Sequence, residues 1–240
     1  EARIDVFVAS DAFEINVDAI PKRCGFAYFV DSVGIDSVND QVAICKFQKA
    51  DLIYKQVLNV FSETAGKLSG LSLDDDHTKV IVYASPSGGV GTSTMAAACA
   101  AHFAAQKKKV LFLSLEKFGS PDLFFSAEGA FTMSDIIYAI KSRKSNLALK
   151  LESCVKQDES GVYFFSQPGI ALDMHELDTS DTLKLISEIK VLGTYDYIVI
   201  DMEFSINEEN LKIYRQAHAL IWVGDGSEMS NTKIQRAYAS

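Results

Sequence analysis

The most constraining feature of the chain is one stretch, residues 80–116, in which an apolar strand runs into a glycine-rich turn. The strand pattern Val80–Ala84 leads to a turn with Gly88, Gly89 and Gly91, and an alanine-rich helical pattern follows before a second apolar strand. Backbone N–H groups that converge in such a turn, together with the positive end of the helix dipole, favour an anion. The stretch therefore predicts a phosphate-binding loop between a parallel strand and its crossover helix.

The loop lacks the lysine that a Walker A motif places before the Ser or Thr that begins the helix. Thr92 stands at that position, and Ser93 stands where the hydroxyl that coordinates magnesium belongs. Eight consecutive residues are predicted to bind the phosphates of a nucleotide: Ser87, Gly88, Gly89, Val90, Gly91, Thr92, Ser93 and Thr94. The alternative is a tight strand-to-helix turn that binds nothing.

Two acidic residues complete the predicted site. An apolar strand ends at Asp201, the pattern of a Walker B strand, and Asp201 is predicted to hold magnesium with Ser93, directly or through water. Glu116 follows the second strand and is the candidate catalytic residue, because it could position a metal-bound or attacking water there. Taken alone, Asp201 could equally be a helix N-cap or a solvated strand end. Glu116 taken alone could be an ordinary surface carboxylate. Their order and spacing relative to the loop favour the functional interpretation.

Two blocks of alternating strand and helix patterns flank a polar stretch. We expect a first domain at 1–66, a linker at 67–78 and a second domain at 79–240. Strand patterns lie at Ile4–Ala9, Phe26–Val30, Val42–Cys45, Lys79–Ala84, Val110–Ser114, Val162–Ser166, Tyr197–Ile200 and Ala219–Val223, and helix patterns at Ala50–Glu63, Ser93–Gln106, Met133–Ser142 and Thr179–Leu192. Uniformly apolar strands separated by helices predict an α/β fold: a doubly wound, mostly parallel sheet preceded by a smaller parallel α/β unit.

Composition excludes several classes of protein. A net charge of −9 argues against nonspecific nucleic-acid binding. The four cysteines are scattered without a C-x-x-C pair, and neither they nor the histidines show metal-ligand spacing. No apolar run approaches the ~20 residues of a membrane span, and no signal-peptide pattern is present. We therefore expect a cytoplasmic protein without direct membrane insertion or a specific nucleic-acid partner.

Residues 79–240 resemble the ParA/MinD family of deviant-Walker ATPases, P-loop NTPases of the SIMIBI type, and within it the TadZ/CpaE-like proteins of Flp-type pilus assembly. The family loop Lys-Gly-Gly-x-Gly-Lys-Thr/Ser corresponds to residues 87–93, and the family's Tyr-Asp-x-apolar-apolar-apolar-Asp is intact at residues 195–201. Ser87 and Thr92 replace the two family lysines, and Ser114 replaces an aspartate. The resemblance implies ATP and magnesium as cofactors, a homodimer held by the nucleotide and, without the lysines, at most weak ATPase activity.

The first block resembles an atypical, flavodoxin-like response-regulator receiver, the domain that precedes the ATPase domain in that subgroup. Lys46 matches the receiver lysine, Phe47 replaces the usual proline, and the acceptor position is Ser10 or Asp11. Only three receiver strands are visible. We therefore expect the start of the receiver, and the end of the ATPase domain with residues that contact the adenine, to lie outside this sequence. The resemblance implies a localisation or assembly factor for Flp/Tad-type pilus machinery, placed at a cell pole or near the membrane through partner proteins.

Two other classes of function stay open. The chain could be a nucleotide-free pseudo-ATPase scaffold, because the replaced lysines are also what loss of function would leave. It could be a Rossmann-type NAD(P)-dependent oxidoreductase, with Glu116 on the ribose. Against the latter, Thr94 occupies the third glycine position and no tyrosine has a lysine four residues later. An active DNA-segregating ATPase is disfavoured by the missing lysines and the acidic charge.

Overall fold

The structure is a computed structural model that describes residues 4–64, 78–143 and 146–239. The described residues divide into two compact units. The first contains the N-terminal residues together with those of Ala139–Cys154, and the second contains the remainder. Except for Thr78, the predicted linker at 67–78 lies outside the described residues. The predicted domain boundaries stay a prediction. They did not anticipate that Ala139–Cys154 belongs to the first unit.

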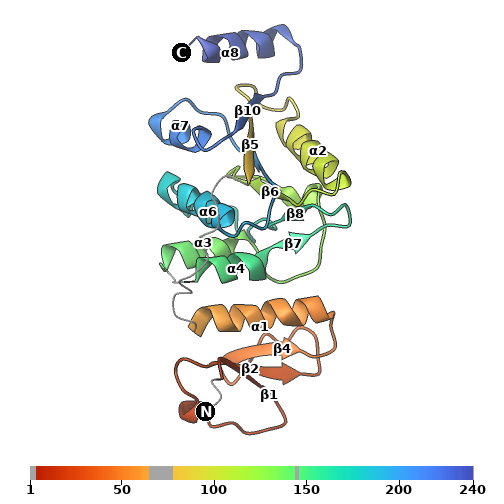
Figure 1. The fold of residues 1–240 in the computed structure, drawn as a ribbon, viewed down its shortest axis with the longest axis vertical. Coiled ribbons are helices and arrows are strands. Elements are labelled where there is room, and N and C mark those ends of the chain that lie inside the picture. The colour runs from red at the N-terminus through yellow and green to blue at the C-terminus, as the bar shows by residue number, and fades with distance from the viewer. Residues whose placement is uncertain (1–3, 65–77, 144–145, 240) are drawn as a thin grey trace. The chain divides into compact units, whose positions relative to one another are not determined.

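The first unit is built on a four-stranded sheet in the order β1-β2-β4-β3, of which β1, β2 and β4 are labelled in Figure 1. Its elements are β1 Val6–Ser10, a 3₁₀ turn Val17–Ala19, β2 Gly25–Val30, β3 Ser37–Val38, β4 Gln41–Cys45, α1 Ala50–Thr64 and α4 Leu147–Cys154. Strand β2 is central and parallel to both β1 and β4. Its successive side chains point to opposite faces, so that Phe26 and Tyr28 pack on one face and Ala27 packs against Ile44 and Val60 on the other.

Helices α1 and α4 pack together within the first unit. The Lys150 Nζ atom donates to Asn59 Oδ1 over 2.6 Å, and the Tyr54 hydroxyl donates to Glu152 Oε1 over 3.4 Å. Lys150 is only 7% exposed, and a charge buried this deeply requires such a partner. Helix α4 was not predicted from the sequence.

The second unit is a six-stranded sheet in the order β10-β5-β9-β6-β8-β7. Its strands are β5 Lys79–Ala84, β6 Val110–Ser114, β7 Lys156–Gln157, β8 Tyr163–Phe164, β9 Tyr197–Asp201 and β10 Ala219–Trp222. Its helices are α2 Thr92–Ala105, the 3₁₀ turn Pro121–Leu123, most of α3 Met133–Lys141, α5 Asp173–Glu176, α6 Thr179–Val191, α7 Glu208–Tyr214 and α8 Glu228–Tyr238.

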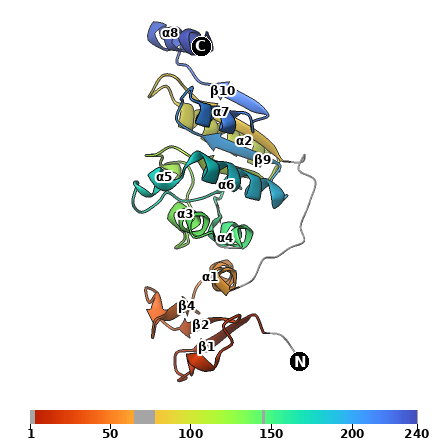
Figure 2. The same ribbon diagram turned by 90° about the vertical axis from the view of Figure 1, so that its left-hand side faces the viewer.

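Helices cover both faces of this sheet (Figures 1 and 2). Helix α2 lies on one face, whereas α6 and α7 lie on the other and contact each other. The buried alanines Ala96, Ala97 and Ala100 let α2 approach the sheet closely, against Phe112 of β6 and Val199 of β9. The alanine-rich pattern is therefore a packing feature.

The predicted fold class is confirmed: an α/β chain with a mostly parallel six-stranded sheet preceded by a smaller α/β unit. Both sheets are mixed rather than wholly parallel, because the two-residue strands β3 and β7 run antiparallel to β4 and β8. The predicted strand at 162–166 is shortened to Tyr163–Phe164, and α5, α7 and α8 were missed. In the part of the chain that the structure describes, no helix has the length and hydropathy needed to cross a bilayer.

The strand order argues against the dinucleotide-binding alternative. In a Rossmann sheet the strand before the glycine turn lies beside the next strand in sequence. Here β9 lies between β5 and β6 and pairs in parallel with both. The second strand, with Glu116 after it, is thus one position removed from where a ribose-binding acid belongs.

A glycine-to-alanine substitution tests the packing of α1 on its sheet. A Cβ atom at Gly25 would lie 2.8 Å from Val60 Cγ1 and 2.9 Å from the Val60 carbonyl oxygen. We expect Gly25→Ala to destabilise the first unit by about 1–3 kcal/mol, the usual cost of overpacking, seen as a lower midpoint in thermal unfolding followed by circular dichroism. Gly169→Ala is the control, because a Cβ there meets nothing within 4 Å. Equal midpoints for both variants would contradict this packing.

Candidate nucleotide-binding site

The glycine-rich turn joins the end of β5 to the start of α2. Gly89 and Gly91 have φ angles of 75° and 88°, a left-handed region that glycine adopts without the clash of a Cβ atom. The Ser85 hydroxyl donates to the Val223 carbonyl oxygen over 2.6 Å and accepts from the N–H of Ser87 over 3.1 Å. These two hydrogen bonds tie the turn to the end of β10, the strand beside β5.

Helix α2 begins without a side-chain cap. Its N-cap residue is Gly91, which has no side chain to offer. Helices α6, α7 and α8 begin instead at Asp178, Asn207 and Ser227, each of which accepts a hydrogen bond from a first-turn N–H. Because the first N–H groups of a helix have no partner inside it, those of α2 are available to a ligand.

A cleft of about 470 Å³ lies at this helix start, a volume within the usual ~300–1,000 Å³ of small-molecule sites. It is lined by Ser85, Ser87, Gly88, Gly89, Gly91, Thr92, Ser93, Thr94, Glu116, Met202, Glu203 and Phe204. The structure thus brings together Glu116 and every predicted loop residue except Val90. Among the described residues that line the cleft, none is basic.

Ser93 lies beside two carboxyl groups. Its hydroxyl donates to Glu116 Oε2 over 3.5 Å and also forms a hydrogen bond with Asp201. Asp201 is 2% exposed, and its Oδ1 atom has no hydrogen-bond partner. Burial, followed by the charge of Glu116, raises the pKa of Asp201 to about 7, whereas the hydrogen bond with Ser93 lowers it. Burial and the charge of Glu203 likewise raise the pKa of Glu116.

Three residues of the cleft, Met202, Glu203 and Phe204, were not predicted from the sequence. They directly follow Asp201 at the carboxyl end of β9, so the only available signal was their position after the Walker B pattern. The ring of Phe204 packs edge-on against Trp222, with centroids 5.3 Å apart. Trp222 is the single tryptophan of the chain, and its fluorescence can therefore report on this side of the cleft.

Lys117 is adjacent to Glu116 but does not line the cleft. Its Nζ atom donates to the carbonyl oxygens of Met174 and Leu177 over 2.7 and 3.3 Å, and burial lowers its pKa. The ammonium group thus holds the segment before α6 and does not replace the missing loop lysine. Within residues 4–64, 78–143 and 146–239, no group of three His, Cys, Asp or Glu side chains converges as a metal site.

Known proteins share both parts of this architecture. Residues 1–62 match the family described as "TadZ-like, receiver domain". A ParA family ATPase from Chlorobium tepidum TLS superposes with a TM-score of 0.55 at 21% identity, over 68% of this chain and 66% of that chain. The septum site-determining protein MinD from Pyrococcus horikoshii OT3, complexed with Mg-ADP, superposes with a TM-score of 0.55 at 19% identity, over 68% and 64%.

The chain carries a TadZ-like receiver domain followed by a ParA/MinD-like ATPase fold.

A third similar structure, the MinC:MinD cell division complex of Aquifex aeolicus, has a TM-score of 0.50 at 24% identity, over 67% of this chain and 62% of that chain. At these identities the likeness concerns the fold. The chain spans slightly less than two thirds of the length of these three relatives. A search of curated protein sequences finds no match.

The receiver domain brings the predicted lysine to an acid that the sequence analysis did not single out. Lys46, after β4, forms an ion pair with Asp31, after β2. The hydrogen bond with Asp31 is the main cause of the raised pKa of Lys46, and the charge of Asp11 adds a smaller effect. Of the two predicted acceptor positions, Ser10 donates its hydroxyl to Asp11 Oδ1 over 3.4 Å. Asp31 was recognisable only as the acid that ends the middle strand.

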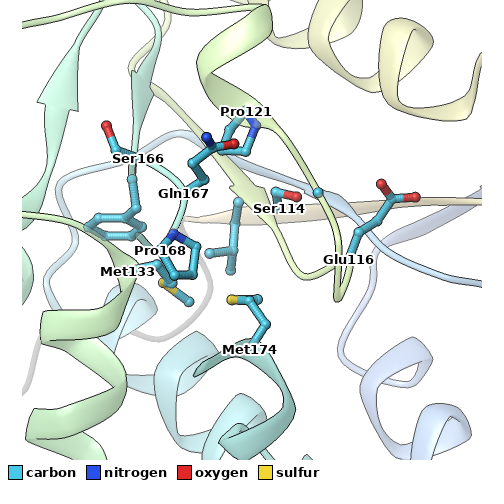
Figure 3. A pocket seen from close by; sticks show the side chains of 11 residues that line it. Ser114, Glu116, Pro121, Met133, Ser166, Gln167, Pro168 and Met174 are labelled. Carbon is cyan, nitrogen blue, oxygen red and sulfur yellow. The ribbon is translucent and has the colours of Figure 1, made fainter. Parts of the chain in front are cut away.

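A second cavity adjoins the ATPase-fold site but is too small for a ligand. Met133, Pro168 and Met174 gather around it, while the carboxylate of Glu116 points away from them (Figure 3). Its volume of about 10 Å³ is roughly that of a single water. The carboxylate of Glu116 therefore belongs to the large cleft at the glycine turn.

The raised pKa of Asp201 makes folding stability depend on pH. Between the ordinary carboxyl pKa of 3.8 and about 7, the folded protein keeps a proton that the unfolded chain has lost. Stability contributed by this group therefore falls as pH rises through that window, by at most about 4 kcal/mol. We expect Asp201→Asn to remove the loss: its free energy of unfolding in urea should fall less from pH 5 to pH 8 than that of the unsubstituted protein.

The measurement is made without divalent cations, because a bound cation would stabilise the carboxylate and mask the effect. Asp225→Asn is the control, since hydrogen bonds with Ser227 lower the pKa of that exposed carboxyl instead. Parallel pH profiles for the unsubstituted protein and Asp201→Asn would show that Asp201 titrates normally.

Proposed function

We propose that the ATPase-fold domain binds MgATP at the glycine turn and hydrolyses it slowly or not at all. The observation that carries this proposal is the buried hydroxyl of Ser87, which has no hydrogen-bond partner and belongs to a cleft-lining residue that is 6% exposed. A buried polar group left unpaired costs roughly 1–3 kcal/mol. A phosphate oxygen in the cleft would accept from this hydroxyl and from the uncapped amides of α2, and thus remove that cost.

The residues around Ser93 also fit a magnesium ion. Ser93 would hold it together with Asp201, directly or through water, since one oxygen of that buried carboxyl is unpartnered. Magnesium takes oxygen ligands and keeps several waters, so one hydroxyl and one carboxylate suffice alongside phosphate oxygens. When bound, the ion supplies positive charge that offsets the phosphates. Glu116 would accept a proton from, or orient, a water near it.

The missing lysines favour binding over turnover. A lysine about 4 Å from a phosphate oxygen contributes on the order of 4 kcal/mol at an effective dielectric constant near 20. If most of that acts in the transition state, its absence slows cleavage by about a hundredfold or more. Binding loses less, because the loop amides and the magnesium ligands are unaffected.

We further propose that residues 1–66 and 79–240 act as two domains of a localisation or assembly factor for Flp/Tad-type pilus machinery. The match of residues 1–62 to a TadZ-like receiver supports this role. The resemblance to ParA/MinD proteins supports a homodimer held by the nucleotide, in the cytoplasm and at a cell pole or near the membrane through partners. The MinC:MinD complex shows that one protein of this fold forms assemblies.

A nucleotide-free scaffold is the second candidate. The acidic residues Glu116 and Glu203 and the absence of a basic side chain among the described lining residues favour it, because negative charge opposes a phosphate chain. The two candidates differ in one measurable quantity, the affinity for MgATP.

Calorimetry decides between them. We expect MgATP to bind with a micromolar dissociation constant and to change the fluorescence of Trp222, which packs on the cleft residue Phe204. Turnover should stay well below 1 s⁻¹, the low end of the ordinary enzyme range. No heat with millimolar MgATP would establish the scaffold instead, and turnover near 1 s⁻¹ or faster would contradict slow hydrolysis. Size-exclusion chromatography with and without MgATP tests the dimer.

Restoring the lysine gives a complementary test. Thr92 lines the cleft at the position of the Walker A lysine, so Thr92→Lys should tighten MgATP binding by about tenfold or more, as expected for a charge near a phosphate. Gln106→Lys is the matched control, because it adds the same charge at the opposite end of α2. Equal affinities for Thr92→Lys and Gln106→Lys would show that the phosphates do not lie at this turn.

A further inference from the structure

We propose that Glu203 makes the cleft discriminate against a third phosphate group, weakening the binding of nucleoside triphosphates relative to diphosphates. This inference rests on the proposed function, since it concerns nucleotides bound at the same turn. It assigns a specificity-determining role to a residue that no sequence motif identifies.

The carboxylate of Glu203 is fixed at the wall of the cleft. The residue follows β9 by two positions and lines the cleft beside Phe204. Its Oε1 atom accepts a hydrogen bond from the backbone N–H of Lys117 over 3.2 Å. An exposed glutamate side chain is ordinarily mobile, and this hydrogen bond to the segment after β6 holds its charge in one place.

Glu203 and Glu116 place two negative charges at the same end of the cleft. Both glutamates line the cleft, and Glu203 accepts a hydrogen bond from the N–H of Lys117, the residue directly after Glu116. Glu116 in turn accepts a hydrogen bond from Ser93. In P-loop proteins the magnesium ligand at this position marks the junction of the second and third phosphates, whereas the turn amides hold the earlier ones. In a bound nucleotide the two carboxylates would therefore lie beside the third phosphate and farther from the first two.

Two further observations indicate that the cleft is built for a ligand. Ser87 lines the cleft and its hydroxyl is buried without a partner, and one oxygen of Asp201 is likewise buried without a partner. The described lining residues include no basic side chain, and Lys117, which interacts electrostatically with Glu203, does not line the cleft. A single added charge at about 4 Å in a water-exposed site then changes a dissociation constant by roughly fivefold to tenfold.

The test compares two nucleotides by calorimetry: MgADP and the magnesium complex of the non-hydrolysable triphosphate adenylyl imidodiphosphate. Glu203→Gln removes the charge and keeps an oxygen that can accept from the N–H of Lys117. Glu159→Gln is the matched control, because Glu159 is exposed in the turn between β7 and β8 and does not line the cleft. Glu203→Asp keeps the charge, and circular dichroism checks that each variant is folded.

We expect Glu203→Gln to tighten the triphosphate by roughly fivefold to tenfold and to leave MgADP within about twofold. Glu159→Gln and Glu203→Asp should keep the original ratio of the two affinities, and high salt should reduce the difference by screening. If Glu203→Gln tightens both nucleotides equally, or neither, the discrimination is disproved while nucleotide binding stands. If the unsubstituted protein binds neither nucleotide at millimolar concentration, the proposed function fails and this inference with it.

Discussion

The pairing of β9 with both β5 and β6 is the constraint on which the rest of the ATPase-fold domain depends. Asp201 is in register with Tyr83 of β5 and with Ser114 of β6. Because the three strands are parallel, their carboxyl ends open at one edge of the sheet, where ligands of open α/β sheets bind. This register brings the glycine turn, Glu116 and Glu203 to a single cleft although they lie far apart in the sequence.

Several polar groups in and beside the cleft lack hydrogen-bond partners, which costs free energy that a bound ligand could recover. The hydroxyl of Ser87 is buried unpaired, the carboxyl of Asp201 is buried with its pKa raised to about 7, and the first turn of α2 is uncapped. Perturbed groups of this kind concentrate at functional sites. Amide dipoles act over short distances, so without a lysine any attraction for a phosphate chain at longer range would have to come from a metal ion that accompanies it.

The sequence predicted the elements whose signal is local. The bounds of β5 and β6 agree with the predicted strands, since continuous apolar runs between turn signals identify buried parallel strands. The strands β3 and β7 are two residues long and too short for any periodicity. Helix α4 depends on packing against α1, which is distant in sequence. Helix α7 was predictable in part, because its cap Asn207 and the acidic residue Glu208 are ordinary start signals.

In the candidate site, too, the residues with a local sequence signal were predicted and the others were missed. The turn and the two acids Glu116 and Asp201 were predicted because they belong to short motifs next to recognisable strands. Glu203 and Phe204 belong to no motif, and only the position of β9 between two other strands brings them to the cleft. Asp31, the partner of Lys46, was missed for the same reason, since it follows β2, the strand beside β4.

The turn also depends on the segment after β10. The Ser85 hydroxyl donates to the Val223 carbonyl oxygen, and the N–H of Val223 donates to the Ala84 carbonyl oxygen over 3.1 Å. The next residue, Gly224, lies so close to α8 that a Cβ atom there would approach Ile234 Cδ1 to 2.8 Å. Helix α8 therefore packs against the strand end that fixes the turn. A displacement of Val223 would therefore either break the hydrogen bond from Ser85 or move the turn with it.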